Sequence, residues 1–171
     1  MRHGGVPPHP QIAAAVNAST EETSERELNI NIVELTLRMA ELLEGVPTLL
    51  QAWAPFAERM VRGHSSDDAF AAYVEDVRQR TAGDLRHLAH SFGDRLSGVQ
   101  TVHRRGQPEV VIPEFVVAQG IDLVVMGTVA RGGFAGLLLG NTAERVLRKL
   151  PCSVLAVKPD GFVSPVGLDV V

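Results

Sequence analysis

A glycine-rich stretch between two apolar runs is the part of this sequence best suited to bind a small molecule. Five glycines lie from Gly127 to Gly140, directly after the apolar run 122–126. Asn141 follows and can accept from N–H groups of a first helical turn, with Glu144 three residues on as a capping-box partner. Unpaired N–H groups and the helix dipole would then point at one spot. The pattern predicts an anion-binding cradle, although such glycines can also serve only a tight surface loop.

Other polar residues have a bland interpretation beside a functional one. Arg131 could neutralise phosphate charge, but a solvated loop residue is the simpler interpretation. His87 and His90 have no neighbouring carboxylate or cysteine ligand, which favours a hydrated helix face over a metal site. His103, with two arginines after it, could line a crevice or lie in an exposed turn. Asn17 could bond to a ligand ring or cap its own turn.

Signatures of catalysis are missing from the chain. The sequence contains no Gly-x-Ser-x-Gly elbow, no His-Glu-x-x-His and no Cys-x-x-Cys. No nucleophile has an arranged base beside it. The residues therefore indicate a binding site without a reaction.

Composition narrows the class of protein. A chain of 171 residues with 45% hydrophobic and 21% charged residues fits one globular domain. The net charge of −4 argues against nucleic acid or an anionic membrane as partner. No run is long enough to span a membrane and no signal-peptide core is visible, so we expect a cytoplasmic protein. The single cysteine, Cys152, is expected to pack as a small apolar group.

Elements alternate along the chain in the order β-α-β-α-β-α-β-α-β. This order predicts a five-stranded parallel sheet with helices on both faces, and ligands bind such sheets beyond the carboxyl ends of the strands, where the strand order reverses. A capping box, Ser24 with Glu27, is expected to open the first helix and Gly45 to stop it. Pro113 is expected to delay the start of the third helix. The strands are expected at 12–16, 48–54, 98–102, 122–126 and 153–157, and the helices at 24–44, 67–92, 108–118 and 142–149.

Three segments carry a resemblance to a known family. They are Asp122–Thr128 (DLVVMGT), Leu139–Glu144 (LGNTAE) and Cys152–Pro159 (CSVLAVKP), and Gly106 with Pro108 adds to them. With these residues the chain resembles the universal stress proteins, and most of all the C-terminal half of their tandem-domain members. The resemblance implies an α/β three-layer sandwich of the adenine-nucleotide α-hydrolase-like (Rossmann-like) type. The resemblance covers the chain from about residue 12 to residue 159. The prolines and glycines of residues 1–10 predict a flexible leader, so we expect a universal stress protein domain at 11–159 and a C-terminal tail at 160–171.

The resemblance also implies a nucleotide pocket, which this chain matches only in part. Nucleotide-binding members carry Gly-x2-Gly-x9-Gly-Ser/Thr, where this chain has Gly127, Ala130, Gly140 and Asn141. A methyl group at Ala130 restricts a position where glycine would admit positive φ or the close approach of a phosphate. The family's first-strand Asp is replaced by Asn17. The cofactor-binding residues implied are Asn17, Ala52, Met126, Gly127, Ala130, Gly140, Asn141 and Thr142, around ATP or another adenine nucleotide with Mg²⁺.

The expected function is that of a non-catalytic, cytoplasmic stress-response module with a degenerate adenine-nucleotide site. Two alternatives stay open, namely an ATP-hydrolysing enzyme of the α-hydrolase type and a ligand-free dimeric scaffold. The segment Ser153–Val157 is expected at a sheet edge, where unpaired backbone groups invite another chain. Members of the family dimerise through this strand, which implies a homodimer here, with no nucleic acid and no membrane as partner.

Overall fold

The computed structural model describes residues 7–128 and 140–159. The elements follow one another as β1 (Gln11–Val16), α1 (Thr23–Leu43), β2 (Val46–Trp53), α2 (Glu58–His64), α3 (Asp67–His90), a 3₁₀ turn η1 (Gly93–Leu96), β3 (Gln100–Arg105), α4 (Pro108–Gln119), β4 (Leu123–Gly127), α5 (Asn141–Leu147) and β5 (Ser153–Val157). All strand pairs are parallel, in the order β3-β2-β1-β4-β5. The predicted five-stranded parallel sheet is confirmed.

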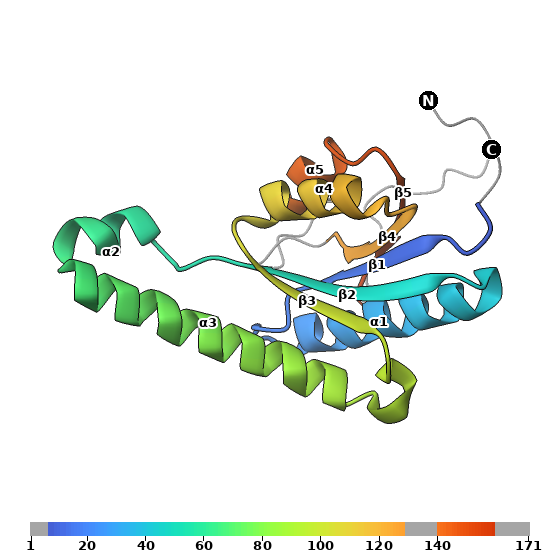
Figure 1. Cartoon of the computed structure of the whole chain (residues 1–171), viewed down its shortest axis with the longest axis horizontal. Helices are drawn as coiled ribbons and strands as arrows, with labels where there is room; N and C mark the ends of the chain where they lie inside the picture. The colour runs from blue at the N-terminus through green and yellow to red at the C-terminus, as the bar shows by residue number, and fades with distance from the viewer. Residues whose placement is uncertain (1–6, 129–139, 160–171) are drawn as a thin grey trace, which may run out of the picture.

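Helices cover both faces of this sheet, which makes three layers (Figure 1). Side chains of the central strand β1 alternate between two cores because successive residues of a strand point to opposite faces. Ile12 and Ala14 pack with α1 and the C-terminal part of α3. Ala13 and Ala15 pack with α4 and α5. A strand buried on both faces is therefore apolar throughout, as parallel strands usually are.

The caps of α1 differ from the expected ones. The helix begins at Thr23 after Glu22, which makes no side-chain cap hydrogen bond, so the predicted capping box of Ser24 and Glu27 is wrong. At the other end Glu44, not Gly45, adopts the left-handed conformation, with φ of 50°. Gly45 has a different role, since a Cβ there would lie 2.7 Å from the carbonyl oxygen of Pro10.

Helix α4 begins at Pro108 despite the proline inside it. The expectation that Pro113 delays the start is wrong. Proline lacks the N–H that would bond to the carbonyl four residues earlier, which belongs to Glu109. The Nζ of Lys149, just after α5, donates to that carbonyl at 2.9 Å. A side chain from a neighbouring segment thus replaces the missing helical hydrogen bond.

The segment between β2 and α3 forms a helix, α2, that the sequence pattern did not predict. Together with the first half of α3 it extends beyond the sheet at the left of Figure 1. We call this projection, residues 55–78, the arm. No side chain of α2 is buried, and Leu85 is the only buried one in α3. Tyr73 Oη donates to the carbonyl of Phe56, just before α2, at 3.0 Å, and Arg62 of α2 lies over the ring of Phe70 of α3. These contacts hold α2 and the segment before it against α3.

Strand β3 lies two or three residues later than expected, because it pairs with β2 as far as Trp53 and Arg105. His103, Arg104 and Arg105 therefore belong to a strand and not to a turn. None of the described helices is both long and apolar enough to cross a bilayer.

The two residues at the end of α1 should respond to substitution in opposite directions. We expect Glu44→Gly to raise the free energy of unfolding by roughly 1 kcal/mol, since an L-residue in the left-handed region is strained. Gly45→Ala should lower it, because the new methyl group meets the carbonyl of Pro10. Urea unfolding of both variants measures the two changes. Stabilisation by Gly45→Ala would contradict this assignment.

Candidate functional site

Backbone register brings the ends of three strands together. Val16, at the end of β1, is paired with Gln51 of β2, and Ala15 is paired with Met126 of β4. Continued by one or two residues, this register puts Asn17 beside Ala52 on one side and beside Thr128, the residue after Gly127, on the other. The strand order reverses here, since β1 leads to β2 on one side while β4 lies on its other side. This is the position at which open parallel sheets bind ligands.

Two hydrogen bonds fix the backbone at the exit of β1. The N–H of Asn17 donates to Asn29 Oδ1 at 3.0 Å, and Asn29 Nδ2 donates to the carbonyl of Asn17 at 2.8 Å. Asn29 lies on the sheet-facing side of α1 and is 5% exposed. Its amide therefore satisfies both backbone groups of Asn17.

A second buried amide holds the next residues of this loop. Gln51, 1% exposed, accepts from the N–H of Ala18 through Oε1 at 3.2 Å. Its Nε2 donates to Ser19 Oγ at 3.1 Å and to the carbonyl of Thr81 on α3 at 3.4 Å. The loop after β1 is thus joined to β2 and α3.

The structural roles of Asn29 and Gln51 were not predicted from the sequence. Gln51 is the one polar residue between Leu49 and Trp53, in a strand predicted to be buried. A buried amide must find hydrogen-bond partners, so this interruption of an apolar run was a usable signal. Asn29 gave a similar signal inside the apolar stripe of α1.

The far side of the site begins at the end of β4. Gly127 faces α1, and a Cβ there would lie 2.7 Å from Leu28 Cδ2. The absence of a side chain at Gly127 therefore allows α1 to pack closely on the sheet. Thr128 is 1% exposed, and its Oγ1 has no hydrogen-bond partner among the described residues. The N–H of Gly140 donates to the carbonyl of Thr128 at 2.9 Å, which brings the start of α5 to the same place.

The start of α5 differs in detail from the prediction. Gly140 precedes the helix without a side-chain cap bond, and Asn141 is its first residue. Glu144 forms an ion pair with Arg148 at 2.6 Å instead of reaching back. The expected cap by Asn141 and the capping box with Glu144 are therefore wrong.

Seven of the eight predicted site residues fall within the described part of the chain. They belong to the carboxyl ends of β1, β2 and β4 and to the first turn of α5: Asn17, Ala52, Met126, Gly127, Gly140, Asn141 and Thr142. Ala130 and Arg131 lie outside the described residues.

The other candidates have structural surroundings that account for them. The ring of His103 stacks on Trp53 at 5.3 Å, and its Nε2 lies 2.9 Å from Thr81 Oγ1. Desolvation, aided by the nearby positive charges of Arg78 and Arg86, lowers the pKa of His103 and favours the neutral ring. His87 and His90 are exposed on α3.

Cys152 packs beside the core of α4 and α5 as expected, and burial raises the pKa of its thiol. Among residues 7–128 and 140–159, no three His, Cys, Asp or Glu side chains are grouped closely enough to hold a metal ion.

Comparison with known proteins identifies relatives over nearly the whole chain. The model of the universal stress protein family matches residues 14–158. A universal stress protein E homolog of Haemophilus influenzae is 36% identical over 152 residues, which cover 88% of this chain and 48% of that protein. This chain thus spans about half the length of that relative.

Solved structures show the same fold. A universal stress protein from Pseudomonas aeruginosa UCBPP-PA14 superposes with a TM-score of 0.68 at 26% identity, covering 91% of this chain and 50% of that one. A universal stress protein family protein from Arabidopsis thaliana, solved with AMP bound, superposes with a TM-score of 0.54 at 20% identity, covering 89% and 93%.

Replacing the amide that holds Asn17 should loosen the site loop. We expect Asn29→Ala to lower the free energy of unfolding by about 2 kcal/mol, because two hydrogen bonds are lost in a buried place. Exchange of the Asn17 amide hydrogen should become faster. Asn31→Ala, two residues along the same helix, is the control and should change stability by less than about 0.5 kcal/mol. Equal effects of the two substitutions would show that the hydrogen bonds between Asn29 and Asn17 do not hold the loop.

Proposed function

Because the chain belongs to the universal stress protein family, we propose that it is a non-catalytic stress-response module that binds an adenine nucleotide at the carboxyl ends of β1 and β4. The carrying observation is the convergence of Asn17, Gly127 and Gly140 at the point where the strand order reverses. The fold shared with an AMP-bound family member supports the same choice of ligand.

The chemistry at this edge suits a base on one side and phosphates on the other. The Asn17 side chain has both a donor and an acceptor, and its backbone is already satisfied by Asn29. Backbone groups near Ala52 and Met126 would flank the base. The buried hydroxyl of Thr128 lies at the start of the segment that would approach the phosphates.

Magnesium would enter with the nucleotide. The described residues provide no acidic cluster for the ion. Mg²⁺ commonly takes few protein carboxylates and is held by substrate phosphates and water. Hydrolysis of ATP by this chain, the first alternative, would need a base beside the attacking water. The seven described site residues include amides, glycines and a hydroxyl but no His, Asp or Glu, and the nearby Glu144 is paired with Arg148.

Assembly as a homodimer through β5 is the second part of the proposal. β5 is the last strand of the sheet and pairs with β4 on one side. On the side away from β4, alternate residues of β5 direct their N–H groups outward, where they can donate to carbonyl oxygens of another chain. Ser153 donates its N–H towards Asp122, so Val154 and Ala156 direct theirs outward.

Titration calorimetry with ATP and Mg²⁺ tests the nucleotide site. We expect heat of ATP binding without release of phosphate from ATP. Release of phosphate would favour the hydrolase, and the absence of binding heat would favour the ligand-free scaffold. Ala130→Gly should tighten binding by up to about tenfold, since glycine would admit the close approach of a phosphate or a positive φ, a conformation that costs an L-residue roughly 1–2 kcal/mol. Ala135→Gly in the same segment is the control for added chain freedom and should not tighten it. Unchanged or weaker affinity of Ala130→Gly would remove the steric argument.

The dimer can be tested at one backbone position. Ala156→Pro removes an outward N–H and leaves the ladder to β4 intact, because proline is tolerated on an edge strand. We expect it to shift the protein from dimer to monomer in light scattering. Ala156→Thr keeps the N–H and should remain a dimer. A wild-type protein that is monomeric at high concentration would contradict the proposal.

A further inference from the structure

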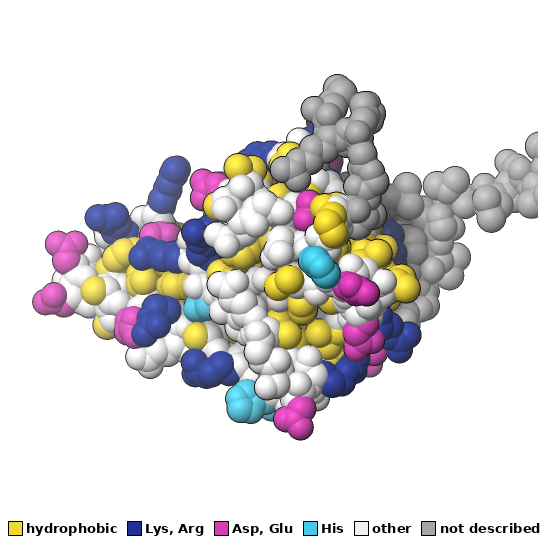
Figure 2. Space-filling view, turned by 45° about the vertical axis from the view of Figure 1, so that its right-hand side comes forward, with side chains coloured by type: hydrophobic (Ala, Val, Ile, Leu, Met, Phe, Trp, Pro, Cys, Tyr) yellow, Lys and Arg dark blue, Asp and Glu magenta, His cyan; other side chains and the backbone are white. Residues whose placement is uncertain are grey.

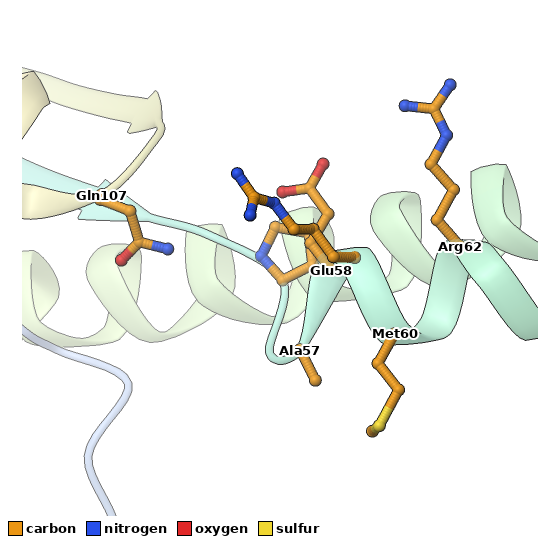
Figure 3. Close-up of a pocket in the computed structure, with 7 residues that line it drawn as sticks. Ala57, Glu58, Met60, Arg62 and Gln107 are labelled. Atoms are coloured by element: carbon orange, nitrogen blue, oxygen red, sulfur yellow. The ribbon is translucent and has the colours of Figure 1, made fainter.

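A groove on the arm lies apart from the proposed nucleotide site. It has a volume of about 660 Å³ and is lined by Pro55, Ala57, Glu58, Arg59, Met60, Arg62 and Gln107. None of these residues is among the predicted nucleotide-site residues. Figure 3 shows Gln107 directed towards the start of α2, with Met60 and Arg62 on opposite sides of that helix.

Apolar side chains remain uncovered here. Met60 is 62% exposed and the neighbouring Phe56 is 86% exposed. Helix α2 has no buried side chain, although Arg62 of α2 contacts the Phe70 ring of α3. An exposed apolar surface with polar residues around it commonly marks an interaction site.

The charge around the groove is opposite in sign to that of the whole protein. The residues that line it include two arginines and one glutamate, a net charge of +1, whereas the chain carries −4. Glu58 is neutralised by Arg105 at 2.7 Å. Within the described residues, Arg59 and Arg62 form no ion pair, and Arg62 lies 5.7 Å from the Phe70 ring. The groove therefore offers unneutralised guanidinium groups beside an apolar floor.

We propose that this groove binds an acidic peptide segment of a partner protein that crosses α2, with an apolar side chain against Met60 on one side of the helix and carboxylates bound by Arg59 and Arg62. Guanidinium groups bind carboxylates through paired hydrogen bonds, and charge complementarity selects the partner. An anionic membrane fits less well. The turn between α2 and α3, at the outer end of the arm, is followed by Asp67 and Asp68, which would meet the lipid first. Acidic side chains are visible at that end in Figure 2.

The proposal can be tested with displayed libraries of short random peptides selected on the purified protein. We expect enrichment of peptides with several Asp or Glu residues around one large apolar residue. The affinity of an enriched peptide, measured by fluorescence anisotropy, should fall at least about tenfold in the double variant Arg59→Glu/Arg62→Glu. It should also weaken at about 0.5 M salt, where the screening length is only a few ångströms.

The control variant is Arg38→Glu/Arg86→Glu, which changes the net charge equally on α1 and the later part of α3. It should keep the peptide affinity, and circular dichroism should show both double variants folded. Nucleotide affinity should be the same in both, so a failure of peptide binding is distinguishable from a failure of the nucleotide site.

Four outcomes would overturn the proposal. The first is selection of peptides without acidic residues, and the second is an equal loss of affinity in both double variants. The third is self-association that Met60→Asp abolishes, which would make the occupant a second copy of the chain. The fourth is binding to phosphatidylserine vesicles that is lost in Phe56→Asp while no peptide is selected, which would make the occupant a membrane.

Discussion

The structure depends on β1 being paired on both of its sides. The strand lies between β2 and β4, so the chain builds one half of the sheet outward to β3 and then crosses to build the other half. Its side chains are small, with three successive alanines, and they allow helices to approach from both faces. The helices that follow β1 and β4, α1 and α5, pack on opposite faces of the sheet. Nucleotide binding is proposed at the carboxyl ends of these two strands because open parallel sheets bind ligands where the strand order reverses.

Two amides give this apolar frame a defined polar edge. Burying an amide costs free energy unless its hydrogen bonds are made, and both Asn29 and Gln51 make theirs with the loop after β1. Once satisfied, such groups favour one conformation over its competitors, since any other loop path leaves them unpaired. The position of Asn17 is therefore set by residues of α1 and, through its neighbours, of β2.

Much of this could be predicted from the sequence because it follows from local pattern. Apolar runs and helical stripes gave the order of strands and main helices, and the edge position of β5 is confirmed. Features that depend on contacts between distant segments were not predictable. Neither expected capping box forms. Gly45 must be glycine because a Cβ there would meet the carbonyl oxygen of Pro10. Strand β3 continues to Arg105 because it pairs with β2 as far as Trp53. Helix α2 escaped notice because it buries no side chain and so has no apolar stripe.

The proline in α4 has a consequence for how this helix can vary. Because Pro113 has no N–H, the Glu109 carbonyl accepts a hydrogen bond from Lys149 instead. The Glu109 carboxylate also accepts one from Arg145. We therefore expect positions 113 and 149 to be energetically coupled. A chain with a residue other than proline at 113 restores the helical hydrogen bond and no longer needs an amine at 149. Among related sequences, the residue types at these two positions should covary, because the residue tolerated at one depends on the residue at the other.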